Sequence, residues 1–391
     1  MAISRAVHQA MENASWIRKM FEAGAAMRKA GKPVYDLSLG NPDLPPPEAF
    51  YQALEAEAVR REPGIHGYMQ NAGFEATRSA VARRASELQD VELDPGDIIM
   101  TSGAGGALNV TLKAILNPGE KVLVSAPYFV EYRFYAANHG GELVTVPTTK
   151  DFDLDLEAIE EKLDDGVAAV IINSPNNPTG RVYSAETLAG LGEVLRKKSA
   201  ERGAPIYLIS DEPYRGVVFE DTVVPPLLSV YPESIICTSY SKELSLAGER
   251  IGYVAINPRA SDHDRLVGAA IFANRTLGFV NAPALMQRIV PRILGAQVDV
   301  ATYARRREVL CKGLEEAGYR FVPPQGGLFI FPEAPGGDDV AFVYSLQEYG
   351  VLAVPGSGFG RPGHFRLAFC VDQRVIEGAL PGLREAIKRR K

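Results

Sequence analysis

Cysteine and histidine are scarce in this sequence. Its 391 residues include three cysteines (Cys237, Cys311 and Cys370) and five histidines. The cysteines lie far apart and are odd in number, which argues against a disulfide framework and against a CxxC metal or redox site. The histidines show no HxxxH or HExxH spacing, so no histidine-based metal site is expected. We therefore predict a protein of a reducing compartment, the cytoplasm, without a metal.

The sequence also lacks long apolar runs and an excess of positive charge. Its longest uninterrupted apolar run, residues 167–172, is far shorter than the ~20 residues that a membrane-spanning helix needs. The first residues carry charges without an apolar core between them, which is unlike a secretory signal. Lysine and arginine number 42 against 48 for aspartate and glutamate. The net charge is therefore negative and gives no electrostatic reason to expect a polyanion as a partner. We expect neither a membrane nor a nucleic acid as a partner.

Short apolar runs rich in β-branched residues alternate with helical patterns between about residues 97 and 256. Seven such runs begin at Ile98, Lys121, Leu143, Val167, Ile206, Ile235 and Gly252. Nearly continuous apolar strands separated by helices indicate a sheet that is buried on both faces and mostly parallel. We predict an α/β fold whose mostly parallel seven-stranded sheet is sandwiched by helices.

The pattern changes after residue 283 and predicts a second, smaller α+β domain. A long helical stretch over about 283–317 is followed by apolar runs at 327–331, 351–354 and 365–369, with a helix near 338–348. A proline-rich segment at 41–47 marks a boundary near the N-terminus. The expected division is 1–45 for an N-terminal arm and part of the small domain, 46–285 for the large domain, and 286–391 for the small domain.

Apolar residues near the N-terminus recur at three- and four-residue steps. They are Val7, Ala10, Met11, Ala14, Ile17 and Phe21. This spacing predicts an amphipathic helix with one apolar stripe. We expect the stripe to cover either the small domain or a partner subunit.

Polar residues follow three of the predicted strands at their C-terminal ends, where open α/β sheets bind ligands. One strand ends in Asn-Ser-Pro-Asn-Asn-Pro-Thr-Gly (173–180), the next in Asp-Glu-Pro-Tyr (211–214), and another in Ser-Tyr-Ser-Lys (239–242), with Arg250 eight residues later. Taken singly, the first motif is equally well a rigid turn, the second a helix N-cap, and the lysine of the third a surface residue. Their succession on strand ends is more specific than any one of them.

Together these motifs resemble the fold-type-I pyridoxal-phosphate enzymes of the class I/II aminotransferase family, the aspartate aminotransferase-like enzymes, over nearly the whole chain. The resemblance implies pyridoxal 5′-phosphate as the cofactor and Lys242 as its Schiff-base lysine, which also moves the substrate proton. It places Asp211 at the pyridine nitrogen, where a carboxylate favours the protonated ring that acts as an electron sink. Tyr214 and Asn177 would bind the phenolic oxygen of the ring.

Two kinds of donor match the phosphate-binding residues of the family. Ala104 and Gly105 stand where a helical pattern begins, so their backbone N–H groups can face an anion. The surrounding glycines are spaced GxGG and lack the third glycine of a dinucleotide-binding loop. The side chains of Ser239, Ser241 and Arg250 would complete the phosphate site, with Arg250 making a bidentate contact.

Four further residues match positions with a role in the family. Phe129 corresponds to the aromatic ring over the pyridine face, with ordinary core packing as the alternative. Arg366 corresponds to the arginine that binds the substrate α-carboxylate through its planar fork, with a strand ion pair as the alternative. Gly40 would lie beside that carboxylate, where a side chain would obstruct closure. Tyr68 would reach the phosphate of a neighbouring subunit, which implies a homodimer with shared active sites.

The predicted function is a pyridoxal-phosphate-dependent aminotransferase that moves an amino group between an L-amino acid and a 2-oxo acid. A β-lyase of the C–S lyase type is the alternative, because the same cofactor serves either reaction according to which Cα bond is aligned with its π system. A regulatory cofactor-binding domain is less favoured, since no basic DNA-binding module is recognisable. Arg275 and His66 could read the side chain of aspartate or glutamate, or could be simple surface residues.

Overall fold

The computed structural model describes residues 3–4, 7–8, 11 and 16–389. Its larger part is built on one sheet with the order β2-β8-β7-β6-β5-β3-β4. The strands are β2 (Ile98–Thr101), β3 (Lys121–Ala126), β4 (Glu142–Pro147), β5 (Val167–Asn173), β6 (Tyr207–Asp211), β7 (Ser234–Ser239) and β8 (Gly252–Ile256). Strand β8 runs in the opposite direction to the other six strands of this sheet, which all run the same way. The prediction of a mostly parallel seven-stranded sheet is confirmed.

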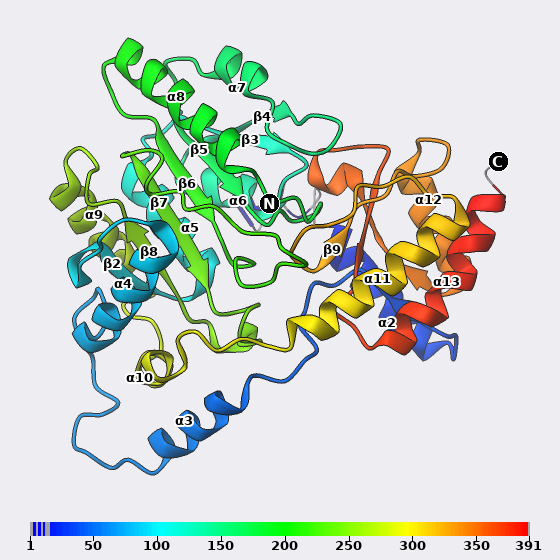
Figure 1. Ribbon diagram of the computed structural model, residues 1–391, viewed down its shortest axis with the longest axis horizontal. Coiled ribbons are helices and arrows are strands. Elements are labelled where there is room, and N and C mark those ends of the chain that lie inside the picture. Colours follow the sequence, from blue (N-terminus) through cyan, green and yellow to red (C-terminus); the bar gives the residue numbers. More distant parts are fainter. Residues whose placement is uncertain (1–2, 5–6, 9–10, 12–15, 390–391) are drawn as a thin grey trace.

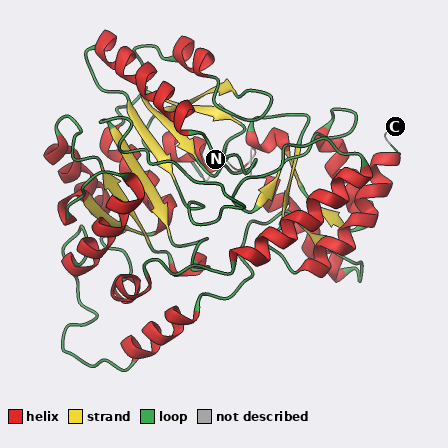
Figure 2. Ribbon diagram, in the orientation of Figure 1, coloured by secondary structure: helices red, strands yellow, loops and turns green. Residues whose placement is uncertain are grey.

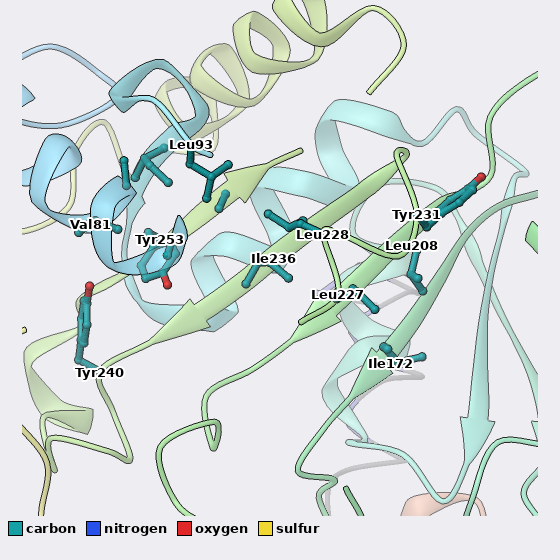
Figure 3. Close-up of a cluster of buried hydrophobic side chains, with 14 of the residues drawn as sticks. Val81, Leu93, Ile172, Leu208, Leu227, Leu228, Tyr231, Ile236, Tyr240 and Tyr253 are labelled. Atoms are coloured by element: carbon teal, nitrogen blue, oxygen red, sulfur yellow. The ribbon is translucent and has the colours of Figure 1, made fainter. Parts of the chain in front are cut away.

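Helices cover both faces of this sheet (Figures 1 and 2). They are α4 (Glu75–Gln89), α5 (Gly103–Ile115), α6 (Glu131–Ala137), α7 (Leu156–Lys162), α8 (Ala185–Arg202), α9 (His263–Thr276) and α10 (Ala284–Ile293). Helix α3 (Glu48–Ala58) lies apart from the sheet and packs on α10 (Figure 1). Because successive side chains of a strand point to opposite faces, Ile171 and Ile209 pack with α5, α6 and α9. Ile172, Leu208 and Ile236 pack on the other face with α4, α8 and α10, as Figure 3 shows in part.

The smaller part contains two short sheets. One has three antiparallel strands in the order β11-β12-β9, and the other pairs β1 with β10. These strands are β1 (Tyr35–Asp36), β9 (Phe329–Ile330), β10 (Val351–Leu352), β11 (Val354–Pro355) and β12 (Phe365–Ala368), and the helices are α2 (Trp16–Lys29), α11 (Val300–Ala317), α12 (Asp339–Leu346) and α13 (Gln373–Lys388). Since β1 is parallel to β10, the N-terminal segment contributes to this part. The boundaries of the predicted domains stay a prediction.

Four short 3-10 helices complete the described elements. They are η1 (Pro95–Asp97), η2 (Ala247–Glu249), η3 (Gln347–Tyr349) and η4 (Gly356–Phe359). The element η3 takes over the end of the helix that was expected near 338–348.

The helical stretch expected over 283–317 is interrupted. Helix α10 ends at Ile293 and α11 begins at Val300. Gly295 between them has a φ of 87°, a left-handed conformation that ends a helix. Asp299 then caps α11 by accepting a hydrogen bond of 3.2 Å from the backbone N–H of Thr302. The apolar periodicity continues across this break, so periodicity alone could not reveal it.

Helix α2 packs on the small part of the molecule, which is one of the two surfaces expected for it. Met20 is 1% exposed, and Trp16 makes an edge contact with Tyr344 at 5.9 Å between ring centroids. Val7, Met11 and Phe21, which were expected in the apolar stripe, are exposed, so the prediction was wrong at these positions. Of the other predicted stripe positions, Ala10 and Ala14 lie outside the described residues, as does the side chain of Ile17. Within the described part of the chain, no helix is long and apolar enough to cross a membrane.

The two parts meet where the loop after β5 touches the segment before β9. The backbone N–H groups of Gln325 and Gly326 both donate to the carbonyl oxygen of Gly180, at 2.9 and 3.0 Å. Gly327 donates to the carbonyl oxygen of Val217 at 2.8 Å. These backbone bonds fix the position of β9 relative to the carboxyl edge of the large sheet.

We expect Gly180→Ala to lower the free energy of unfolding more than Gly203→Ala does. Both glycines have a positive φ, 73° and 70°, so each substitution costs about 1–2 kcal/mol of backbone strain. Only at Gly180 would the new methyl group overlap Pro324 and lie 2.8 Å from the Gly326 carbonyl oxygen, which adds about 1–3 kcal/mol. Urea unfolding of both variants measures the difference, and equal losses would contradict this packing.

Candidate active site

A cavity of about 280 Å³ opens at the carboxyl ends of β5, β6 and β7, against the small part of the molecule. Every residue predicted for the site except Tyr68 lines it. They are Gly40, Ala104, Gly105, Phe129, Asn177, Asp211, Tyr214, Ser239, Ser241, Lys242, Arg250 and Arg366. Residues that are up to 326 positions apart in the sequence therefore converge on one space.

Lys242 lies in the turn that follows β7. Its ammonium nitrogen Nζ donates a hydrogen bond of 2.7 Å to the carbonyl oxygen of Gly40. Burial lowers the pKa of Lys242, and the nearby positive charges of Arg366 and Arg250 lower it further. A lysine with a lowered pKa is available as an uncharged amine, which is the form that attacks carbonyl groups and accepts protons.

Asp211 is the last residue of β6 and is 4% exposed. Its Oδ2 atom accepts a hydrogen bond of 2.6 Å from the hydroxyl of Tyr132, whereas its Oδ1 atom is buried without a partner in the described structure. Burial raises the pKa of Asp211 to about 7, against the effect of the Tyr132 hydrogen bond. An open carboxylate oxygen in such a place fits a cationic N–H donor, and a protonated pyridine nitrogen is one.

Arg366 is a buried cation on β12, with 2% of its surface exposed. Its Nη1 donates to Asn177 Oδ1 at 2.9 Å and its Nη2 to the Ser38 carbonyl oxygen at 2.7 Å. Burial lowers its pKa to about 10, which still leaves it charged near neutral pH. No carboxylate of the described residues forms an ion pair with it, so the strand ion pair allowed by the sequence is absent there. A carboxylate ligand would supply the missing anion.

The Arg366 guanidinium lies close to two aromatic rings. It is 4.2 Å from the ring centroid of Phe329 and 4.7 Å from that of Phe359. Gly40 packs against the Phe329 ring, which a Cβ atom at Gly40 would overlap. The absence of a side chain at Gly40 is thus required by packing on Phe329, in addition to the access for a carboxylate that the sequence suggested.

A group of hydrogen-bond donors lies at the N-terminus of α5. Ala104 and Gly105 belong to its first turn, whose backbone N–H groups have no partner within the helix. Ser239 Oγ donates to Ser241 Oγ at 2.9 Å. The Arg250 side chain is held across the start of α5 by bonds of 2.8 Å to the Ala247 carbonyl oxygen and 3.4 Å to that of Ser102. These donors are suited to a phosphate group.

The remaining cavity walls are aromatic. The Phe129 ring meets the Tyr132 ring edge-on at 5.6 Å between centroids. Tyr214 is 5% exposed, and burial raises its pKa, so its hydroxyl stays a neutral donor. The floor is fixed by Asn173, which donates to the Asp211 carbonyl oxygen at 2.8 Å and accepts from the Asn177 backbone N–H at 2.6 Å.

Several contributors were not singled out from the sequence. Tyr135, Asn173 and Phe329 line the cavity, and Tyr132 donates a hydrogen bond to Asp211, which lines it. Asn173 stands at the start of the loop motif after β5, and the two tyrosines follow Phe129 within six residues, which was the available signal. Tyr132 could not be linked to Asp211 from sequence alone, because the two are 79 residues apart.

Three candidates do not reach the cavity within this chain. Tyr68 is 93% exposed and borders a separate surface hollow together with His66. Arg275 is exposed on α9, where its guanidinium lies 5.3 Å from the ring centroid of Phe272.

Among the residues that the structure describes, no group of three or more His, Cys, Asp or Glu side chains could hold a metal ion.

Comparison with known proteins gives a consistent result. The family model described as "Aminotransferase class I and II" matches residues 32–383. "Aspartate aminotransferase" of Thermotoga maritima is 31% identical over 93% of this chain and 94% of its own length. "Probable aspartate/prephenate aminotransferase" of Aquifex aeolicus is 34% identical over 90% and 91%.

Solved structures agree in fold. The crystal structure of an amino transferase from Eubacterium rectale covers 100% of both chains with a TM-score of 0.96 and 36% identity. The aspartate aminotransferase from Thermus thermophilus with maleate covers 98% of this chain and 99% of its own, with a TM-score of 0.87 and 27% identity.

In the absence of ligand, Asp211 should make the protein less stable as the pH rises from about 4 to about 7. Its pKa rises from the ordinary 3.8 to about 7 on folding, so the unfolded chain releases the proton at a lower pH than the folded protein does. Asp211→Asn removes this loss, which is on the order of 4 kcal/mol at most. Thermal unfolding of ligand-free protein should show the variant melting above the wild type at pH 8 and not at pH 4. A constant difference across this range would refute the assignment.

Proposed function

The chain belongs to the class I and II aminotransferases and is an aminotransferase, and on that premise we propose that its cavity binds pyridoxal 5′-phosphate and uses Lys242 as the reactive amine. One observation carries the proposal. Two buried charged groups with unmet interactions, Asp211 and Arg366, line the same cavity as the buried Lys242 amine. A cofactor with a ring nitrogen and a substrate with a carboxylate would satisfy both groups.

The cavity residues would hold the cofactor by its three polar regions. Ala104, Gly105, Ser239, Ser241 and Arg250 would bind the phosphate. Asp211 would keep the ring nitrogen protonated, while Tyr214 and Asn177 would bind the ring hydroxyl and Phe129 would cover one ring face. When bound, pyridoxal phosphate supplies an electron sink for negative charge at the substrate Cα.

Lys242 would act as the general base and acid of the reaction. Its lowered pKa suits an amine that takes a proton from the substrate Cα and gives it back at the amino-group side. Arg366 would hold the α-carboxylate in two parallel hydrogen bonds, which retains that group and opposes decarboxylation. The β-lyase alternative draws no support from the relatives named above.

Acidic amino acids are the proposed donors. The relatives named above are aspartate or aspartate/prephenate aminotransferases, and the Thermus thermophilus structure holds maleate, a dicarboxylate. Lys242, Arg250 and Arg366 are the cations of the cavity, and each already has a proposed role. A cation for the second carboxylate would therefore come from outside this set, with exposed Arg275 and His66 as the candidates on a neighbouring subunit.

We further propose a cytoplasmic homodimer with shared active sites. The chain between α3 and α4, which contains Tyr68, runs along the outer edge of the molecule (Figure 1). A tyrosine that is 93% exposed is free to reach the phosphate region of a second copy. The three cysteines, Cys237, Cys311 and Cys370, are all unpaired, in keeping with a reducing compartment.

Absorption spectroscopy tests the function. Wild-type protein incubated with pyridoxal phosphate should show a cofactor band that shifts when aspartate or glutamate is added and returns with 2-oxoglutarate. Lys242→Ala should lose this exchange by about 10²–10⁴-fold, because the proton-transfer group is gone. A wild type without any cofactor band would overturn the proposal. Turnover of a substrate with a β-leaving group, in the absence of any oxo acid, would instead favour the lyase.

Subunit mixing tests the shared site. Tyr68→Phe and Lys242→Ala homodimers should each be impaired, because every site in them lacks one group. Unfolding and refolding them together should restore activity, since one site of each mixed dimer combines an intact Lys242 with an intact Tyr68 from the other chain. A mixture no more active than its parents, or a wild type that elutes as a single chain on gel filtration, would refute the shared site.

A further inference from the structure

We propose that Tyr132 is a positioning residue of this site: its hydroxyl aims the Asp211 carboxylate at the cofactor ring, and its own ring supports Phe129. The inference rests on the proposed function, because it concerns the same bound cofactor. It adds a residue that makes no contact with the reacting atoms and acts through two residues that line the cavity.

The contact to Asp211 is short and buried. Tyr132 lies on α6, is 1% exposed, and its Oη atom is 2.6 Å from Asp211 Oδ2. Within the described chain it is the one side chain that donates a hydrogen bond to this carboxylate. A carboxylate group turns easily about its terminal torsion, so a single firm bond to Oδ2 determines where Oδ1 points. Tyr132 thereby leaves Oδ1 open for the cofactor.

The same residue also supports the aromatic wall. The Tyr132 backbone N–H donates to the Phe129 carbonyl oxygen at 3.1 Å, and the two rings meet at 87° with centroids 5.6 Å apart. Edge-to-face packing of this kind favours one relative orientation. Tyr132 therefore couples the carboxylate that would meet the edge of a flat cofactor ring to the aromatic group that would cover its face.

A tyrosine provides a donor that does not titrate near neutral pH. Burial, followed by the charge and hydrogen bond of Asp211, raises the pKa of Tyr132 well above 10, and the neighbouring Tyr214 and Tyr135 act in the same direction. A histidine in this position would change its protonation between pH 5 and 8. The Tyr132 hydroxyl thus keeps its proton, and remains a donor to Asp211, over the working range.

Tyr132→Phe removes the hydroxyl and keeps the ring, and Tyr231→Phe is the matched control. Tyr231 is also 1% exposed and donates a buried hydrogen bond of 3.0 Å to the Ile206 carbonyl oxygen, but it does not line the cavity. We expect Tyr132→Phe to raise the dissociation constant for pyridoxal phosphate and to lower kcat, each by about 10- to 100-fold, as loss of a hydrogen bond to a charged group does. The control should change neither quantity, although both variants lose some thermal stability.

The pH titration of the cofactor band gives a readout that a structural role would not move. With Asp211 poorly aimed, the ring nitrogen would hold its proton less firmly and would withdraw less electron density from the nitrogen through which Lys242 is joined to the cofactor. That second nitrogen, whose protonation the absorption change reports, would then be more basic, so the midpoint in Tyr132→Phe should move to higher pH. Tyr132→His, which still offers a donor, should recover part of the cofactor affinity. An unchanged midpoint together with unchanged affinity would overturn the proposal.

A double variant identifies the route of action. If Tyr132 acts through the Asp211 carboxylate, Tyr132→Phe should cost little in an Asp211→Asn background, whereas independent effects would multiply. Multiplying effects would overturn the proposal even if both single variants were impaired. These results are separable from failure of the proposed function, because in that case the wild type itself would show no cofactor band.

Discussion

Burial of charge at the carboxyl edge of the large sheet governs the rest of the site. It moves the pKa of Lys242 and Arg366 downward and that of Asp211 upward, so each group is shifted toward its neutral form. The lysine gains reactivity from this shift. The other two carry a desolvation cost that partners within the chain do not fully offset. The same environment therefore makes the site reactive and makes a bound ligand a stabilising part of the molecule.

The register of the central strands fixes the positions of the residues at this edge. Asp211 on β6 is paired with Asn173 on β5 and with Cys237 on β7, so its backbone is held from both sides. Asn173 then fixes the Asp211 carbonyl and the start of the Asn177 loop. Asn177, Tyr214 and Lys242 lie three or four residues past the ends of β5, β6 and β7, so the strand ends restrict where these side chains can be placed.

Much of this arrangement was predictable because the information is local. Continuous apolar runs such as 167–172, rich in β-branched residues and alternating with helical patterns, favoured strands buried on both faces, and polar motifs directly after such strands are expected at one edge of a parallel sheet. Other features depend on contacts that sequence does not encode locally. The break at Gly295 leaves the apolar periodicity intact, Phe21 is exposed although its spacing suits a buried stripe, and the Tyr132 contact to Asp211 joins distant segments. Tyr68, which was predicted to reach a second subunit, is exposed within this chain.

The aromatic rings near Arg366 restrict which ligands the site could be altered to bind. With the rings of Phe329 and Phe359 packed close to it, and two of its nitrogens bonded to Asn177 and Ser38, the guanidinium has little freedom to swing aside for a differently shaped molecule. The side chain has already lost its conformational entropy on folding, which favours tight recognition of one group. Directed evolution toward amines without a carboxylate would therefore have to repack these aromatic neighbours, since replacing the arginine alone would leave a gap beside the two rings.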